Sequence, residues 1–266
     1  MVLENKRQFV SLSGRCAFDC NHCYTLSPAY KQRLDSHTIP EIVNSLADKS
    51  FDIVYVSGHR ENFINPDEGL DLCESIFKAY NTDLLLTTRN TFTGIQLVRL
   101  YELNQAMKAK GKDLYFCVSI PCTSSYRLLE PCELIPTPEE RIEFLKSVYS
   151  LDIYTLLTIR PLCPDTFIRV GETLEIVDAC HTFSSAVISS GIVVDEYIKK
   201  RLGNFPEYKS VKGELMKCLE NMQMTVEYVN VEKEWTQIRE RCDKYGIRLF
   251  DHSCPAIEYL KAVNQP

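Results

Sequence analysis

Six short β-rich runs alternate with helix-compatible segments along the first 191 residues, and no other feature limits the possible folds as strongly. Each run is rich in β-branched or aromatic residues and nearly continuously apolar, as expected of strands that are covered on both faces. The runs span residues 7–13, 51–58, 83–88, 113–120, 152–159 and 184–191.

The segments between these runs carry helix start signals. Thr38 followed by Glu41 has the spacing of a capping box, and Asn65 before Pro66 is a favoured N-cap and N1 pair. Strands separated by helices form βαβ units, which build a parallel sheet with right-handed crossovers. We therefore expect an α/β fold with helices over residues 38–49, 65–80, 91–111, 137–150 and 171–183.

The regular alternation fades after residue 191. The remaining segments predict helices with two short strands over residues 195–223, 225–231, 234–246 and 247–263. No repeat, low-complexity tract or Pro/Gly-rich linker marks a second independent domain. We expect one domain over residues 1–197 and an extension or lid, residues 198–266, that packs on it.

The composition excludes several classes of protein. Apolar residues at 45% and charged residues at 25% are average for a globular chain. A net charge of −6 argues against an extended nucleic-acid surface, which needs clustered Lys and Arg. No apolar run is long enough for a membrane span or a signal peptide, so we expect a cytoplasmic protein.

Cysteine usage is the unusual part of the composition. The chain has 12 cysteines, and three of them, Cys16, Cys20 and Cys23, follow the first strand within eight residues. In a reducing compartment, clustered cysteines are more often metal ligands or catalytic groups than disulfides. Zinc sites add a second close pair of ligands downstream, and no such CxxC or HxxxH pair exists here. Three thiolates can instead hold three irons of a [4Fe–4S] cluster and leave the fourth iron open.

Polar residues also follow the other five strands. The carboxyl ends of parallel strands meet at one edge of the sheet, where chemistry gathers in α/β folds. Polar loops are common, but polar residues after all six predicted strands, with the cysteines after the first, favour one shared site. The segments concerned are residues 57–62, 87–94, 119–127, 159–167 and 189–197.

The stretch CAFDCNHC, residues 16–23, resembles the CX3CXΦC motif of radical S-adenosylmethionine (SAM) enzymes. In that superfamily the motif follows the first strand of a partial (β/α)6 TIM-like barrel, and the resemblance covers about residues 7–197. It implies a [4Fe–4S] cluster on Cys16, Cys20 and Cys23, with SAM as the second cofactor. His22 stands at the Φ position, which contacts adenine, and Tyr24 beside it could assist.

Other positions resemble further SAM-binding landmarks of the family. The stretch SGHREN, residues 57–62, is similar to the family's GGE motif, so Ser57, Gly58 and the backbone around His59 would receive the methionine ammonium group. Ser119 resembles the ribose contact, and Arg160 would hold the methionine carboxylate or the ribose. The stretch GIVVDE is similar to the adenine-binding GXIXXY segment, with matches at Gly191 and Val193.

The resemblance implies a reaction in which one electron, from a donor such as flavodoxin or ferredoxin, drives the cleavage of SAM. The 5′-deoxyadenosyl radical then abstracts hydrogen from a small-molecule, nucleotide-like or short-peptide substrate. Arg89, Asn90 and Arg127 follow strand ends and are candidate substrate contacts.

The other cysteines allow more than one interpretation. Cys122 and Cys163 directly follow strand ends, so they are candidate catalytic hydrogen donors. Together with Cys132 and Cys254 they could instead hold an auxiliary cluster, or be structural. The rest are expected to be core residues, namely Cys73, Cys117, Cys180, Cys218 and Cys242.

Two further function classes stay open. An iron–sulfur electron-transfer protein would use the same three thiols but would not need a methionine pocket at Gly58, Ser119 and Arg160. A zinc-binding interaction module would need a fourth protein ligand, for which His22 is the nearest residue.

Overall fold

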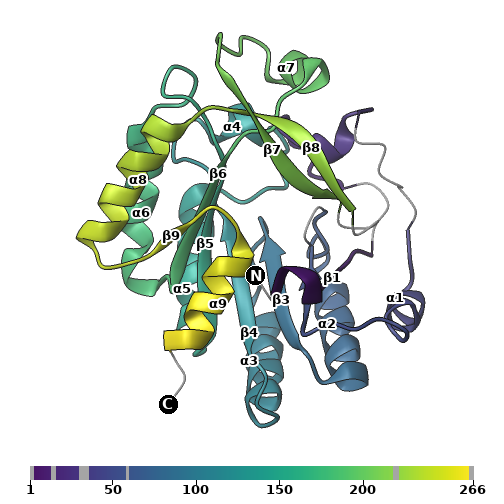
Figure 1. Ribbon diagram of the computed structural model, residues 1–266. Helices are drawn as coiled ribbons and strands as arrows, with labels where there is room; N and C mark the ends of the chain where they lie inside the picture. Colours follow the sequence, from purple (N-terminus) through teal and green to yellow (C-terminus); the bar gives the residue numbers. More distant parts are fainter. Residues whose placement is uncertain (1–2, 13–15, 30–35, 58–59, 218–221, 264–266) are drawn as a thin grey trace.

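The computed structural model describes residues 3–12, 16–29, 36–57, 60–217 and 222–263 (Figure 1). Its main element is a parallel seven-stranded sheet in the order β1-β2-β3-β4-β5-β6-β9. The predicted α/β fold is confirmed, and the sheet with its alternating helices has the form of a partial TIM-like barrel. The strands are β1 (Arg7–Val10), β2 (Ile53–Val56), β3 (Asp83–Thr88), β4 (Leu114–Ser119), β5 (Tyr154–Leu162), β6 (Ala186–Gly191) and β9 (Leu249–Phe250).

Helices cover the outer face of the sheet. Thr38 and Thr137 each form a complete capping box, with Glu41 and Glu140 as the returning partners. The helix predicted after Asn65 begins at Pro66, although the Asn65 side chain makes no capping hydrogen bond. None of the described helices is long and apolar enough to cross a membrane. The helices are α1 (Ile39–Ser45), α2 (Pro66–Tyr80), α3 (Gly94–Lys108), α4 (Tyr126–Leu129), α5 (Pro138–Tyr149), α6 (Val170–Cys180), α7 (Glu196–Leu202), α8 (Glu232–Lys244) and α9 (Ser253–Val263), with short 3-10 turns at Leu3–Lys6, Tyr24–Leu26 and His181–Phe183.

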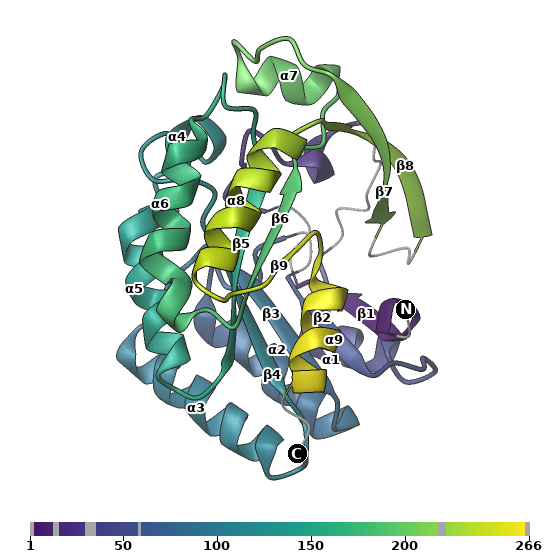
Figure 2. The same cartoon turned by 60° about the vertical axis from the view of Figure 1, so that its left-hand side comes forward.

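Two apolar layers lie on the two faces of the sheet. Alternate strand residues point outward to the helices, for example Val54 and Leu84, and the residues between them point inward, for example Ile53 and Leu85. The inner layer is completed by α9, whose Ile257 packs among the inward-facing strand residues. Figure 2 shows α9 on the concave side of the sheet, close to the N-terminal 3-10 turn. The interior of the barrel is therefore filled by the C-terminal helix at the end opposite the cysteine loop.

The C-terminal part differs from its prediction in one element. The segment 195–223 was expected to be helical, but α7 ends at Leu202, before Gly203 with φ 71°. Residues Ser210–Lys217 then form strand β7, which pairs antiparallel with β8 (Met222–Val229) as a separate two-stranded sheet. The helical prediction for this stretch was wrong because Gly203 ends α7 and the two-stranded ribbon that follows has only a weak apolar pattern in its sequence.

Candidate functional site

A cavity of about 880 Å³ lies at the carboxyl ends of the barrel strands, beneath the β7–β8 hairpin. Its walls come from the cysteine loop, from the ends of strands β2 to β6, from the hairpin and from the loop before α9. The predicted site residues that line it are Cys16, Cys20, His22, Cys23, Tyr24, Ser57, Ser119, Arg160, Gly191 and Val193. Gly58 and His59 lie outside the described residues, so their predicted role stays a prediction.

The cysteine loop is docked onto the end of α4. The backbone N–H of Asn21 donates to the Leu129 carbonyl at 2.8 Å, and the Asn21 side chain donates to the Leu128 carbonyl at 3.0 Å. Carbonyls at a helix C-terminus lack partners within the helix, so α4 offers them to the loop. Cys20 is buried, and the loop's Phe18 packs against Ile135 beside it.

The three thiols of the loop line the same cavity. Burial raises the pKa of Cys16 and of Cys20, and thiolate charge at Cys23 would raise both further. Among the described residues, no three His, Cys, Asp or Glu side chains converge on a point that could hold a single metal ion. Three thiolates that line one cavity fit a multi-iron cluster, which binds each thiolate at a different iron.

A buried ion network stands directly behind this loop. The Arg89 Nε donates to Glu130 at 2.7 Å, and the other Glu130 oxygen lies 2.8 Å from the Arg141 guanidinium. The side chains of Glu130 and Arg141 are both fully buried. Although burial opposes its ionisation, Arg141 and Arg89 hold the pKa of Glu130 below its ordinary value. Arg141 also donates to the carbonyl of Ser119 at 2.6 Å, which ties the network to the end of β4.

The His22 ring is held in one neutral tautomer by this network. Its Nδ1 lies 3.2 Å from the Leu129 carbonyl, so Nδ1 carries the proton and donates. Its Nε2 then accepts from the Arg89 guanidinium at 3.4 Å. Burial and the charge of Arg89 lower the pKa of His22 to about 3. A neutral, oriented ring is suited to flat contact with a ligand rather than to acid–base work at neutral pH.

Two polar side chains in the cavity wall point to a missing ligand. Ser119 is 1% exposed, and its Oγ has no hydrogen-bond partner among the described residues. Arg160 donates through one terminal nitrogen to the Asp251 carbonyl, but its Nε has no partner among those same residues. Buried polar groups are nearly always hydrogen-bonded in folded proteins, so orphans that face a cavity indicate a ligand that completes them. A ligand with hydroxyl and carboxylate groups, as SAM has, fits this pair.

The remaining predicted cofactor residues have structural partners as well. Ser57 has φ 70°, and its Oγ accepts from the Asn62 N–H at 2.8 Å, which closes the loop after β2. Tyr24 packs with Val193 against the inner face of the hairpin. A Cβ on Gly191 would lie 2.7 Å from the Val229 carbonyl oxygen. Gly191 is therefore needed for the close approach of β8, whatever else it contacts.

Several residues that the strand-end argument singled out do not line the cavity. Cys122 and Cys163 are buried in the layer between the sheet and the outer helices, and burial raises the pKa of both thiols. Asn90 donates to the Phe63 carbonyl, and Arg127 donates to the carbonyls of the loop around Cys132. The structure thus gives these four residues packing or loop-closing contacts, and of the proposed substrate contacts only Arg89 lines the cavity.

Sequence reasoning missed the residues that support the site from a distance. Glu130 and Arg141 lie in a loop and a helix where charged residues are usually solvated, and only the tertiary structure brings them together. It also missed the far end of the cavity, where Arg7, Tyr55 and Ser253 meet. At this end the Arg7 guanidinium donates to the sulfur of Cys254, a residue far away in the sequence, at 3.0 Å.

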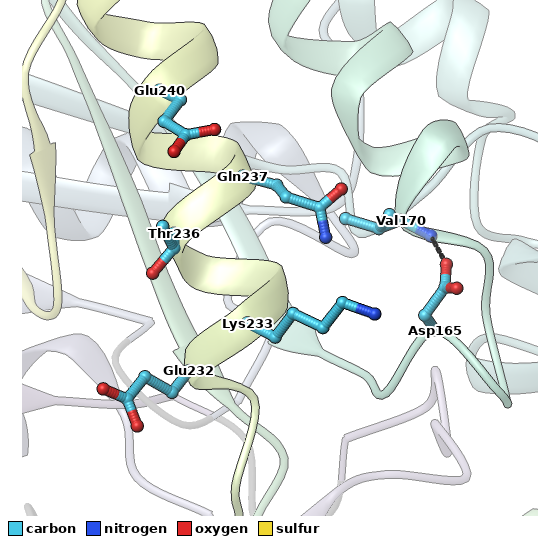
Figure 3. Close-up of a pocket in the computed structure, with 7 residues that line it drawn as sticks. All are labelled: Asp165, Val170, Glu232, Lys233, Thr236, Gln237 and Glu240. Atoms are coloured by element: carbon cyan, nitrogen blue, oxygen red, sulfur yellow. Dashed lines mark hydrogen bonds between the residues drawn. The ribbon is translucent and has the colours of Figure 1, made fainter.

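A second hollow, of about 570 Å³, lies outside the barrel between α8 and the loop that precedes α6 (Figure 3). Its polar groups stabilise that loop: the Val170 N–H donates to Asp165 at 2.8 Å, and the Asp165 N–H donates to Glu234 at 3.0 Å. Figure 3 shows Gln237 and Lys233 projecting from α8 toward these two residues. None of the residues that line this hollow is a cysteine.

Comparison with known proteins supports the fold assignment. No protein-family model and no curated protein matches the chain. Among solved structures, SuiB of Streptococcus suis bound to S-adenosylmethionine superimposes with a TM-score of 0.60 at 11% identity, over 94% of this chain and 51% of SuiB. The same protein bound to its precursor peptide SuiA gives 0.58 at 10% identity, over 97% of this chain and 51% of SuiB.

The enzyme anSMEcpe with bound AdoMet gives a TM-score of 0.54 at 13% identity, over 91% of this chain and 62% of that one. The chain therefore spans about half the length of SuiB and less than two thirds of anSMEcpe. At these identities the comparisons establish the fold alone, which resembles that of SuiB and of anSMEcpe, both solved with bound S-adenosylmethionine (AdoMet).

Proposed function

We propose that this chain is a radical SAM enzyme that holds a [4Fe–4S] cluster on Cys16, Cys20 and Cys23. The observation that carries the proposal is that a CX3CX2C loop lines a cavity at the strand ends of a fold that resembles radical SAM enzymes. When bound, the cluster and SAM supply one-electron cleavage of SAM, which yields a radical that can take hydrogen from a substrate.

The chain's own residues would bind and orient these groups. Ser119 and Arg160 would donate hydrogen bonds to SAM, since both carry unpaired polar atoms in the cavity wall. The neutral His22 ring would lie against the adenine, with Tyr24 beside it under the hairpin. Gly191 and Val193 would bring the hairpin close, so that the cavity excludes water. The predicted roles of Ser57, Gly58 and His59 at the methionine ammonium belong to the same proposal.

The substrate would enter beside the hairpin. SuiB has been solved with its precursor peptide SuiA, and anSMEcpe with the peptide Cp18Cys, so a peptide is the substrate class we favour over a small molecule or nucleotide-like compound. Reduced flavodoxin or ferredoxin would supply the electron. Residues 198–266 would act both as a lid, through the hairpin, and as an interior plug, through α9.

The proposal is tested by anaerobic reconstitution with iron and sulfide, followed by reduction in the presence of SAM. We expect a 4Fe–4S electron paramagnetic resonance signal that SAM perturbs, and 5′-deoxyadenosine by chromatography. Cys20→Ala should abolish both. Cys132→Ala is the matched control, because Cys132 packs against the same hydrophobic group, Phe18, Cys20 and Ile135, but lies outside the motif.

Other outcomes would redirect the assignment. A cluster that forms normally but neither responds to SAM nor supports its cleavage would favour an electron-transfer protein. A colourless protein with one zinc per chain would contradict the argument from the cysteine spacing onward. Loss of the cluster in Cys132→Ala as well as in Cys20→Ala, with the ligand-free stability of both variants unchanged, would show that the ligand set is wrong.

A further inference from the structure

The two outer edges of the β7–β8 hairpin differ in their backbone hydrogen bonding. The edge of β8 is occupied by residues 192–194: the Val229 N–H donates to the Ile192 carbonyl at 2.9 Å, and the Val194 N–H donates to the Glu227 carbonyl at 3.1 Å. The backbone groups of Glu227 and Val229 therefore point away from β7. On the other side of the hairpin, no described residue pairs with β7 except those of β8.

The register shows which groups of β7 are left without a partner. The Asn230 N–H donates to the Lys209 carbonyl at 2.8 Å, so this is a hydrogen-bonded pair. Hydrogen-bonded and non-hydrogen-bonded pairs alternate along an antiparallel ladder. With Val211 opposite Tyr228, the residues that turn their N–H and C=O groups outward are Ser210, Lys212, Glu214 and Met216. Among the described residues, no hydrogen bond reaches the outward groups of Ser210 or Lys212.

This open edge borders the cavity. Val211, Lys212 and Gly213 all belong to the cavity wall. The inner face of the hairpin is defined by Tyr228, whose ring lies over Gly213 so closely that a Cβ there would be 2.7 Å from it. Lys212 is exposed on the opposite face. A strand added to the edge would therefore have one face over the cavity and one face in solvent.

We propose that the outward edge of β7 binds the extended backbone of a peptide substrate as an added strand, which directs every second side chain of the peptide into the cavity. This inference rests on the proposed function, which supplies the reason for a substrate to reach the cysteines. Unpaired strand edges are templates for a further strand, and peptide recognition by strand addition uses them in this way. Outward groups recur along β7 every second residue, about 6.8 Å apart, and an extended peptide presents amides at that spacing.

The test uses the full chain with its cluster reconstituted and a displayed library of random dodecapeptides as the probe. A selected peptide is then synthesised with one backbone nitrogen methylated at a time, and its dissociation constant is measured by fluorescence anisotropy. We expect methylation at alternate positions to weaken binding about tenfold, as expected for a lost backbone hydrogen bond, with no effect at the positions between them.

A pair of variants probes the protein side. Lys212→Pro removes an outward N–H that makes no hydrogen bond to β8, and proline is tolerated on strand edges. Lys212→Ala shortens the side chain and removes its charge but keeps the N–H. We expect the proline variant to bind the selected peptide about tenfold more weakly than the alanine variant. If the proline variant does not fold, the methylation series on the wild-type chain still decides the question.

Three results would overturn the proposal: no enriched peptide, methylation effects without a two-residue period, or equal binding by the two Lys212 variants. Self-association of the wild-type chain that Lys212→Pro abolishes would also overturn it, since the edge would then join two copies. Failure of the proposed function is distinguishable, because it would leave period-two binding intact while SAM is not cleaved.

Discussion

Glu130→Gln is the substitution whose effect the structure defines most sharply. The Glu130 carboxylate is fully buried between two guanidinium groups, at 2.7 Å from Arg89 and 2.8 Å from Arg141. Glutamine keeps the shape but removes the negative charge and turns an amide N–H₂ toward one of the two cations. The buried Arg141 would then lack a counterion among the described residues, whereas Arg89 would keep the charge of Glu61 nearby.

The size of the stability loss depends on how deeply the two arginines are buried. Removing one partner of a buried ion pair destabilises a protein by about 3–5 kcal/mol, because it leaves a charge without compensation. The Arg141 side chain is fully buried, so it should contribute the full effect, whereas the Arg89 side chain is 24% exposed and can be partly hydrated. We expect a loss of about 4 kcal/mol in the free energy of unfolding, near the middle of that range.

Urea unfolding of the ligand-free, reduced chain, followed by circular dichroism, measures this loss. Glu139→Gln is the matched control, since Glu139 is exposed in the first turn of α5 and should contribute only about 0.3–1 kcal/mol through the helix dipole. Adding Arg141→Met to Glu130→Gln should recover part of the loss, because it removes the stranded cation. A loss below about 1 kcal/mol in Glu130→Gln would refute the reasoning from buried charge.

Three further predictions concern the cavity. His22 has a pKa of about 3 in the folded chain against about 6.5 in the unfolded chain, so the stability that it contributes is present above pH 6.5 and is lost as the pH falls toward 3. Between pH 7 and 5, the free energy of unfolding of the ligand-free wild type should therefore fall by about 1–2 kcal/mol more than that of His22→Phe. Gly191→Ala should destabilise the chain by about 1–3 kcal/mol because the added Cβ meets the Val229 carbonyl oxygen. Gly171→Ala adds its Cβ into open space and should leave the free energy of unfolding, measured for both variants by urea titration, unchanged. Ser119→Ala should change the free energy of unfolding by less than about 1 kcal/mol yet weaken SAM binding to the reconstituted protein about fivefold by equilibrium dialysis; unchanged affinity would contradict a ligand contact at this hydroxyl.

Local signals account for what the sequence predicted well. The six strands were found because each is a short apolar run with its own boundaries, and the capping box at Thr38 depends only on residues three positions apart. The cysteine loop was found for the same reason, since its three thiols lie within eight residues. The polar cavity residues Ser119 and Arg160 were found because parallel strands place their carboxyl ends at one edge of the sheet.

The features that were missed depend on contacts between distant segments. An amphipathic helix such as α9 shows in its sequence that one face is apolar, but not that this face fills the inside of the barrel. Strand β7 was read as helix because a two-stranded ribbon over a cavity buries little, and its pattern is correspondingly weak. Arg127 looked like a substrate contact because it follows a strand end, but its guanidinium is occupied by the carbonyl of Cys132.

The same long-range contacts limit how metal content can be interpreted. The cysteine loop is positioned by the α4 carbonyls and by the Arg89–Glu130 pair, neither of which is a candidate ligand. A Glu130 variant should therefore fail to hold the proposed cluster although the carboxylate is not among its proposed ligands, because the loop would no longer hold its thiols around one space. Iron loss alone cannot identify a ligand in this protein. A ligand assignment needs a cysteine variant that loses iron while its ligand-free stability is unchanged, and the half-buried Cys23 separates those two effects better than the buried Cys20.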